Sequence, residues 1–282
     1  MPVYDTPEPI TAAVEGVYGP IRFHAGPRIT TEVLVRPGNP ADPEDARAAA
    51  ETRVEFTAGR LVVRRPKKGP LSRLIGASGE TVIDIGLPAG SAVEVDAAGE
   101  IHTSGELGEC TLTSSYHDVR VEHAAALRVS AAHGDVFVGS VGGTTTITSA
   151  YGAIEAGRLG GHTAVKATHG DVRIAETGGD LRVRHASGLV FLGRAGGDVA
   201  ISTAYGDLRV AEVSGGTVTL ETNTGGIEIG IAEGTAAWLD VSSGYGTVSV
   251  GLDAGDGPGA GLRTAEITAR AGYGDIRVRR AP

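Results

Sequence analysis

Acidic and basic residues recur together at matching points of a repeated sequence, and paired carboxylates are the groups that general acid and base catalysis needs. The aspartates are Asp118, Asp135, Asp171, Asp207 and Asp275, and arginines follow two residues later at Arg120, Arg173, Arg209 and Arg277. Two carboxylates at a fixed separation could hydrolyse a glycosidic bond. We favour a structural role, in which the aspartates accept hydrogen bonds from turn amides and the arginines neutralise them across neighbouring repeats.

A second column of chemistry-bearing residues precedes the turn glycine of each repeat. It reads Tyr116, His133, Tyr151, His169, Ser187, Tyr205, Thr224, Tyr245 and Tyr273, and so holds five of the seven tyrosines. Exposed rings at regular heights can bind sugars, peptides or bases, or they can simply stack on one another and cover the turns. His133 and His169 lie two repeats apart, about 9.6 Å, too far to share one metal ion.

Two phenylalanines, Phe137 and Phe191, occupy the same outward positions as the arginines. A large apolar side chain on an outward face either packs under an arginine plane or belongs to a partner surface. The candidate partner surface therefore comprises Phe137, Phe191, Tyr151, Tyr205, Arg173 and Arg209. We expect no catalytic, cofactor-binding or metal-binding residues, because the central repeats leave no room for loops that wall a groove.

Short strands must position these side chains, because glycines recur every eighteen residues. The glycines are Gly134, Gly152, Gly170, Gly188 and Gly206, each followed by alternating apolar residues, and a second strand follows each glycine pair such as Gly160-Gly161. A fixed period of this length is typical of a solenoid. The sequence predicts an all-β, single-chain parallel β-solenoid (β-helix), right-handed, with about 18 residues per rung. An oval and a triangular section both fit.

The ends of the chain depart from this pattern. Residues 1–80 are predicted to form an irregular β-rich start or cap segment, and residues 81–282 the repeat array. A short helix over 43–53 is indicated by Asp42 as N-cap and Pro43 at the first helical position, and it could cover strand edges. A basic cluster at 60–73 reads as a solvated loop or a contact for an acidic partner, and 253–261 as an excursion loop.

The final segment bears on whether such solenoids join end to end. It carries Arg277, Arg279, Arg280 and Pro282. On a terminal strand, charges and a missing amide donor would oppose the stacking of one molecule on the next. A structural polymer is therefore a minor alternative.

Composition limits the other classes of function. The net charge of -9 opposes general binding to nucleic acid or anionic lipid, and no apolar run is long enough to span a membrane. Because the first residues lack the features of a secretory signal, a cytoplasmic location is expected. The single cysteine, Cys110, has no disulfide partner within the chain and is expected to be a small core residue.

Three segments together resemble a known family. They are Thr6-Pro7-Glu8-Pro9-Ile10, the stretch from Ile83 to Ser91, and the repeated turns of Tyr or His, Gly, Asp and a hydrophobic residue. The chain resembles the bacterial adhesin-like family of β-strand-repeat proteins, a domain family of unknown function. The resemblance implies a β-solenoid without a catalytic motif. The expected function is a non-enzymatic binding or scaffold protein with an unknown protein or glycan partner, as a monomer or weak oligomer; the alternative is a carbohydrate-active enzyme or a polymer-forming protein.

Overall fold

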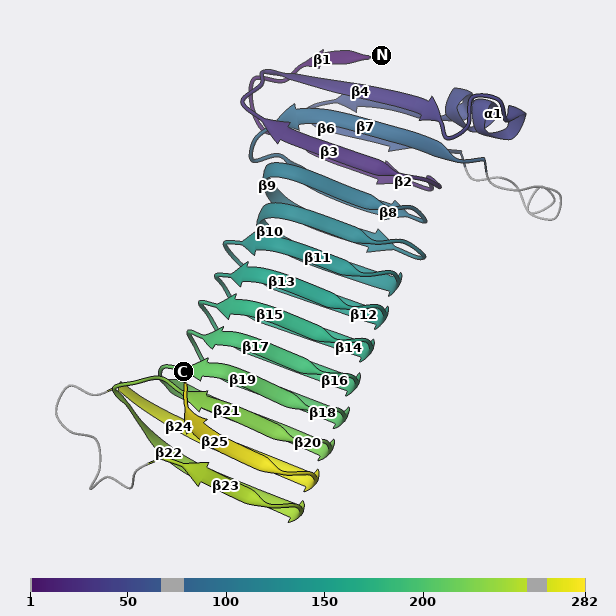
Figure 1. Ribbon diagram of the computed structural model, residues 1–282. Helices are drawn as coiled ribbons and strands as arrows, with labels where there is room; N and C mark the ends of the chain where they lie inside the picture. The colour runs from purple at the N-terminus through teal and green to yellow at the C-terminus, as the bar shows by residue number, and fades with distance from the viewer. Residues whose placement is uncertain (1, 67–78, 253–262, 282) are drawn as a thin grey trace. The chain divides into compact units, whose positions relative to one another are not determined.

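The computed structural model describes residues 2–66, 79–252 and 263–281 as an almost all-β chain (Figure 1). It contains two compact units, residues 1–138 and 139–282, whose boundary lies within strand β11 (Val136–Val141). The predicted start of the array near residue 80 falls inside the first unit.

The second unit consists of rungs, each made of two strands joined by a turn that contains tyrosine in four of the described rungs and His169, Ser187 or Thr224 in the others. The strands that precede this turn are β12 (Thr145–Tyr151), β14 (Thr163–His169), β16 (Leu181–Ser187), β18 (Val199–Tyr205), β20 (Gly216–Thr224), β22 (Thr235–Tyr245) and β24 (Arg263–Tyr273). The strands that follow it are β13 (Ile154–Leu159), β15 (Val172–Thr177), β17 (Val190–Ala195), β19 (Leu208–Val213), β21 (Ile227–Ile231), β23 (Val248–Gly251) and β25 (Ile276–Arg280).

Each strand pairs in parallel with its counterpart in the next rung. Thr163 of β14 lies beside Thr145 of β12 on one side and Leu181 of β16 on the other, an offset of eighteen residues each way. Parallel strands require a crossover, and here the second strand of each rung provides it. The predicted parallel β-solenoid is therefore confirmed.

The core of the second unit is a set of apolar columns between the two stacks of strands. One column holds Ile154, Val172, Val190, Leu208, Ile227 and Ile276, each at most 2% exposed. Alternate residues of a strand face opposite sides, so these positions point inward while the residues between them point to solvent. Branched side chains suit such half-buried strands, which explains the repeated choice of Val and Ile.

The rungs of the second unit are not stacked in chain order at the C-terminal end. Strand β24 lies between β20 and β22, and β25 lies between β21 and β23 (Figure 1). Arg279 of β25 donates hydrogen bonds to Glu228 of β21 at 2.8 and 3.1 Å. This contact lowers the pKa of the Glu228 carboxyl, and the charge of Arg209 lowers it to a smaller extent. The inference that Arg277, Arg279 and Arg280 guard a terminal edge was wrong, because the last strand of the chain is an inner strand.

The first unit has the same kind of insertion at its N-terminal end. Its strands are β1 (Val3–Asp5), β2 (Thr11–Glu15), β3 (Ile21–Gly26), β4 (Thr30–Pro37), β5 (Arg53–Thr57), β6 (Arg60–Arg64), β7 (Thr81–Pro88), β8 (Ala92–Ala97), β9 (Ile101–Ser114) and β10 (Val119–His133). Strand β2 lies between β6 and β8, and β3 lies between β7 and β9, all in parallel. The early strands are thus part of the stack itself.

Beyond that insertion, the first unit ends in antiparallel strands and one helix. Strand β4 pairs antiparallel with β7 and β1, and β5 pairs antiparallel with β6. Helix α1 (Pro43–Glu51) packs on β4 and β7; the side chain of its N-cap Asp42 accepts from the Glu44 amide. The predicted helix is confirmed and ends two residues earlier than expected, where Arg53 begins β5.

Three other features of the sequence have defined positions. Cys110 is fully buried in β9, and burial raises the pKa of its thiol to about 12, as expected for an inert core residue. Within the basic cluster, Arg60 pairs with Glu94, Arg64 pairs with Glu55, and the buried Arg65 donates to the Gly79 carbonyl. Residues 67–73 of that cluster and the predicted loop 253–261 lie outside the described residues. Within the described part of the chain, no helix is long and apolar enough to cross a membrane.

Candidate functional site

A column of residues along one edge of the second unit carries four exposed tyrosines. In order of stacking it contains Tyr151, His169, Ser187, Tyr205, Thr224, Tyr273 and Tyr245, each paired in register with the next. We call these seven residues the tyrosine column. Its tyrosines are 51–70% exposed, whereas the inward columns beside them are buried. The tyrosine column is therefore a surface feature with no role in the core.

The rings of the tyrosine column are of two kinds. Tyr151 stacks on His169 with ring centroids 5.0 Å apart, and Tyr245 stacks on Tyr273 at 4.8 Å. Tyr205, by contrast, lies between Ser187 and Thr224 and is 65% exposed. The nearest rings in the column, His169 and Tyr273, are two strands away, about 9.6 Å, which is beyond stacking range. Tyr205 is accordingly not stacked on another ring of the tyrosine column.

The first unit has a smaller counterpart of this stacking. Tyr116 stacks on His133 with an angle of 2° between the rings and centroids 5.9 Å apart, and Tyr116 is 66% exposed. The predicted stacking of rings is thus confirmed for these pairs. The predicted contact with a ligand stays a prediction.

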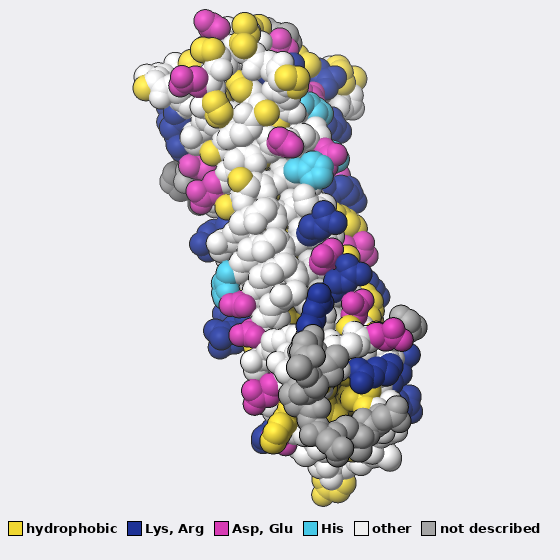
Figure 2. All heavy atoms as spheres, turned by 90° about the vertical axis from the view of Figure 1, so that its left-hand side faces the viewer, with side chains coloured by type: hydrophobic (Ala, Val, Ile, Leu, Met, Phe, Trp, Pro, Cys, Tyr) yellow, Lys and Arg dark blue, Asp and Glu magenta, His cyan; other side chains and the backbone are white. Residues whose placement is uncertain are grey.

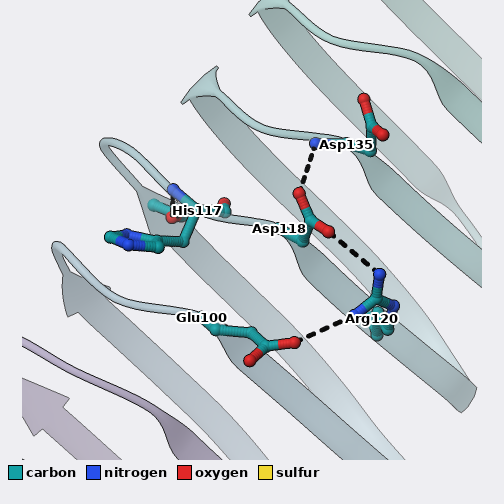
Figure 3. A network of polar contacts seen from close by, with 6 residues as sticks. Glu100, His117, Asp118, Arg120 and Asp135 are labelled. Atoms are coloured by element: carbon teal, nitrogen blue, oxygen red, sulfur yellow. Dashed lines mark hydrogen bonds and ion pairs between the residues drawn. The ribbon is translucent and has the colours of Figure 1, made fainter.

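The aspartates beside these turns bind the backbone of the next rung. In the first unit, Asp118 Oδ1 accepts from the Asp135 amide at 2.9 Å and Asp118 Oδ2 accepts from Arg120 at 2.9 Å (Figure 3). Arg120 also donates to Glu100 at 2.9 Å. The Asp118 carboxylate is thus held in place by an amide on one oxygen and a guanidinium on the other.

The same arrangement recurs in the second unit. Asp171 accepts from the Leu189 amide, Asp207 from the Gly226 amide and Asp275 from the Thr247 amide, at 2.7–2.9 Å. The predicted bonds to turn amides are therefore confirmed. The predicted neutralisation across rungs was wrong for these aspartates, because Arg173 binds Asp171 of its own rung at 2.8 Å. Arginines reach neighbouring rungs through glutamates, as Arg209 does to Glu228.

The two phenylalanines have arginine neighbours. The guanidinium of Arg120 lies 4.7 Å from the centre of the Phe137 ring, which is the first of the two expected explanations for Phe137. Phe191 is half-buried on β17, in register with Arg173 of β15 and Arg209 of β19. Within the second unit the structure thus brings Phe191, Arg173 and Arg209 together on one face, and it places Tyr151 and Tyr205 in the column at the turn edge.

A buried histidine supports the turns beneath the tyrosine column. His185 Nε2 donates to the Gly170 carbonyl at 2.8 Å, and Thr203 Oγ1 lies 3.4 Å from Nδ1. This assignment gives the neutral ring its proton on Nε2. Burial lowers the pKa of His185 and outweighs the Gly170 hydrogen bond, which raises it.

The opposite edge of the rungs carries no tyrosine in the described part of the second unit, but it has its own aspartate bonds: Asp180 accepts from the Asp198 amide at 3.3 Å and Asp198 from the Thr217 amide at 2.8 Å. This edge is formed by glycine pairs that pack on one another: a Cβ added at Gly161, Gly179 or Gly197 would lie 2.6–2.8 Å from the backbone of the pair in the rung before. Figure 2 shows this side, with backbone and uncharged polar groups in white along the middle of the face and charged groups beside them. Close backbone contact and aspartate bonds thus hold this edge together, and the exposed side chains of His162 and Asp180 lie 4.0 Å apart on it.

Trp238, the only tryptophan of the chain, was not singled out from the sequence. It lies on β22 and is 78% exposed. The alternation of residues along this strand could have predicted its exposure, because Trp238 occupies an outward position between Ala237 and Leu239. Because β22 falls outside the perfect repeat, its outward positions were not assigned.

Comparison with protein families gives one match, to the model described as Toastrack DUF4097, over residues 55–281. The chain belongs to the toastrack DUF4097 family. This agrees with the resemblance noted from the sequence and covers the strands from β5 to β25. No curated protein matches the chain.

Two solved structures are similar to this toastrack chain. One is a candidate cell adhesion protein from Clostridium sporogenes, 13% identical, with 99% of this chain and 98% of that chain covered and a TM-score of 0.21. The other is a candidate adhesin from Bacteroides fragilis, 11% identical, with 98% and 95% covered and a TM-score of 0.29.

Proposed function

We propose that this toastrack protein is a non-enzymatic binding protein whose tyrosine column contacts an extended glycan. The observation that carries the proposal is the 65% exposure of Tyr205, which has no aromatic register neighbour, in a column whose tyrosines are all more than half exposed. Several large apolar groups kept in solvent along one edge favour a ligand that covers them.

A glycan fits the chemistry of the column better than a globular partner does. A pyranose ring has a face of C–H groups, which packs on the negative face of an aromatic ring, and a rim of hydroxyls that need polar partners. The register neighbours of Tyr205 are Ser187 and Thr224, whose hydroxyls are suitable partners for such a rim. Asp207 and Arg209 follow Tyr205 in the chain and supply charge near the same turn.

The carboxylates support binding in preference to hydrolysis. Asp171 accepts from the Leu189 amide with one oxygen and from Arg173 with the other. Asp207 accepts from the Gly226 amide at 2.7 Å. Groups held in this way stabilise turns, and the acid and base roles of a glycosidase require carboxyl groups directed at a substrate.

The test is binding of the protein to a panel of immobilised polysaccharides, with three variants. Tyr205→Ser removes the ring, Tyr205→Phe keeps it, and Ile29→Ser removes a different apolar side chain that is 67% exposed and lies outside the column. We expect Tyr205→Ser to weaken binding at least tenfold, while Tyr205→Phe and Ile29→Ser bind like the wild type. Equal binding by Tyr205→Ser, or no binding to any polysaccharide by the wild type, would contradict the proposal.

A further inference from the structure

The second unit ends in a rung whose outer side has no partner among the described residues. Strand β22 pairs only with β24 and strand β23 only with β25 in that part of the chain. The core columns also continue to this side. Val248 and Val250 of β23 are 39% and 45% exposed, whereas their register partners Ile276 and Val278 are 0% and 1% exposed. This terminal rung therefore presents unpaired backbone groups and part of an apolar core.

Within the described residues, the terminal rung lacks the features that usually keep a strand edge from associating. Strand edges are commonly protected by charges, by proline, by short length or by a covering helix. The two strands β22 and β23 contain one charged residue, Asp240, and no proline. Arg270 of β24 already binds Asp240 at 3.1 Å.

The N-terminal end of the first unit shows the opposite treatment. Its outermost strands are β1, which has only three residues, and β5. The exposed positions of β5 are Arg53, Glu55 and Thr57, two of which are charged. Tyr4 of β1 packs on Phe56 of β5 with ring centroids 4.9 Å apart, and α1 packs on β4 and β7. One end of the chain is thus protected, and the other is not.

We propose that the β22/β23 rung is a self-association face, on which a second copy of this chain docks through its own β22/β23 rung. The amides, carbonyls and apolar side chains on this face have no partners among the described residues of their own chain. The same rung on the second copy supplies those partners. A two-fold axis makes the contact isologous and the joined strands antiparallel. Since the one carboxylate of the rung is paired within its own chain, the face meets its copy without an unpaired charge. The protected N-terminal end limits the assembly to two copies.

The test introduces charge on the edge while leaving the fold intact. Ser242 of β22 and Ser249 of β23 are exposed and lie in register with Arg270 and Arg277. Arg270 already binds Asp240 and Arg277 lies 3.9 Å from Asp275, so the double variant Ser242→Glu/Ser249→Glu adds net negative charge to the rung, and like charges meet across the two-fold axis. The matched control is Ala164→Glu/Ala200→Glu, which adds the same charge on inner strands on either side of Arg182.

Sedimentation equilibrium of the full chain over a range of concentrations gives the mass. We expect the wild type and the control to reach twice 28.6 kDa, and the edge variant to remain at 28.6 kDa. Fluorescence of Trp238 gives an independent reading, because docking of the rung should lower its quenching by acrylamide in the wild type and leave it unchanged in the edge variant. A wild type that stays monomeric, equal dimerisation of the edge variant, or growth beyond two copies would overturn the proposal. Polysaccharide binding through Tyr205 does not depend on any of these results.

Discussion

The two turn edges of the second unit stack in the same way and differ in the side chains that they expose. At the glycine-pair edge a Cβ at Gly179 would lie 2.8 Å from Gly161, and at the tyrosine edge a Cβ at Gly206 would lie even closer to the backbone of Gly188. Aspartates join successive turns at both edges, as Asp198 does to the Thr217 amide and Asp171 to the Leu189 amide. Within the described part of the second unit, tyrosine rings project into solvent at the tyrosine edge alone. The stack does not require these rings, since Ser187 and Thr224 take their place in two rungs.

The largest expected effect is at the glycine-pair edge. Gly161→Ala places a Cβ 2.6 Å from the backbone of Gly143, and neither backbone can move without disturbing its ladder. We expect a loss of about 3 kcal/mol in the free energy of unfolding, measured by urea denaturation. Gly142→Ala is the matched control, because a Cβ there meets nothing within 4 Å, and its effect should stay within about 0.5 kcal/mol. Equal effects of the two substitutions would refute backbone contact as the feature that holds this edge.

A smaller effect is expected for the aspartate bonds of the tyrosine edge. Asp171→Ala leaves the Leu189 amide without its acceptor, which should cost about 1–2 kcal/mol of unfolding free energy. Asp171→Asn retains an oxygen that can accept from this amide and loses only a half-exposed ion pair with Arg173, worth about 0–1 kcal/mol. The difference between the two variants in urea denaturation measures the amide bond. An alanine variant as stable as the asparagine variant would show that the bond contributes nothing.

The smallest effect concerns the pH dependence of the tyrosine edge. In the unfolded chain a histidine has a pKa of about 6.5, and burial lowers the pKa of His185 in the folded chain. As pH falls below about 6.5, the unfolded state takes up a proton that the folded state does not, so the free energy of unfolding decreases until pH falls below the folded pKa. Above pH 6.5 this contribution to stability is fully present.

The variant His185→Thr should reduce that pH dependence. Threonine occupies the same register column at Thr203 and Thr222, and Thr222 donates to the Gly206 carbonyl as His185 does to Gly170. Urea denaturation at pH 8 and pH 5 measures the change for each protein. A wild type whose stability falls no more than that of His185→Thr would rule out His185 as the titrating group.

The regular rungs were predictable because one period governs both the core and the turns. Between Ile154 and Val213 every register pair is eighteen residues apart, so the inward columns, the aspartates and the tyrosine column could be aligned from the residues alone. For Phe137 the sequence left two explanations open. The choice between them depended on where the flexible Arg120 side chain lies, which spacing does not determine.

The order of the terminal rungs was not predictable in this way. The wider glycine spacings after Gly206 were interpreted as a loosening of the array, whereas Val218 in fact pairs with Ile267, forty-nine residues later. Any two rungs of this repeat have complementary edges, so the sequence pattern does not state which of them are neighbours. The exposure of Trp238 and of Val250 follows from that order and was missed for the same reason.

The inserted position of β24 and β25 has a consequence for how the protein is made. A chain emerges from the ribosome from its N-terminus, so β22 and β23 are available before the strands that must lie between them and β20 and β21. Parallel neighbours distant in sequence form slowly, because a long loop must close first. Completion of the second unit therefore waits until β24 and β25 are synthesised and inserted. An edge of β22 and β23 that later becomes internal is exposed until then.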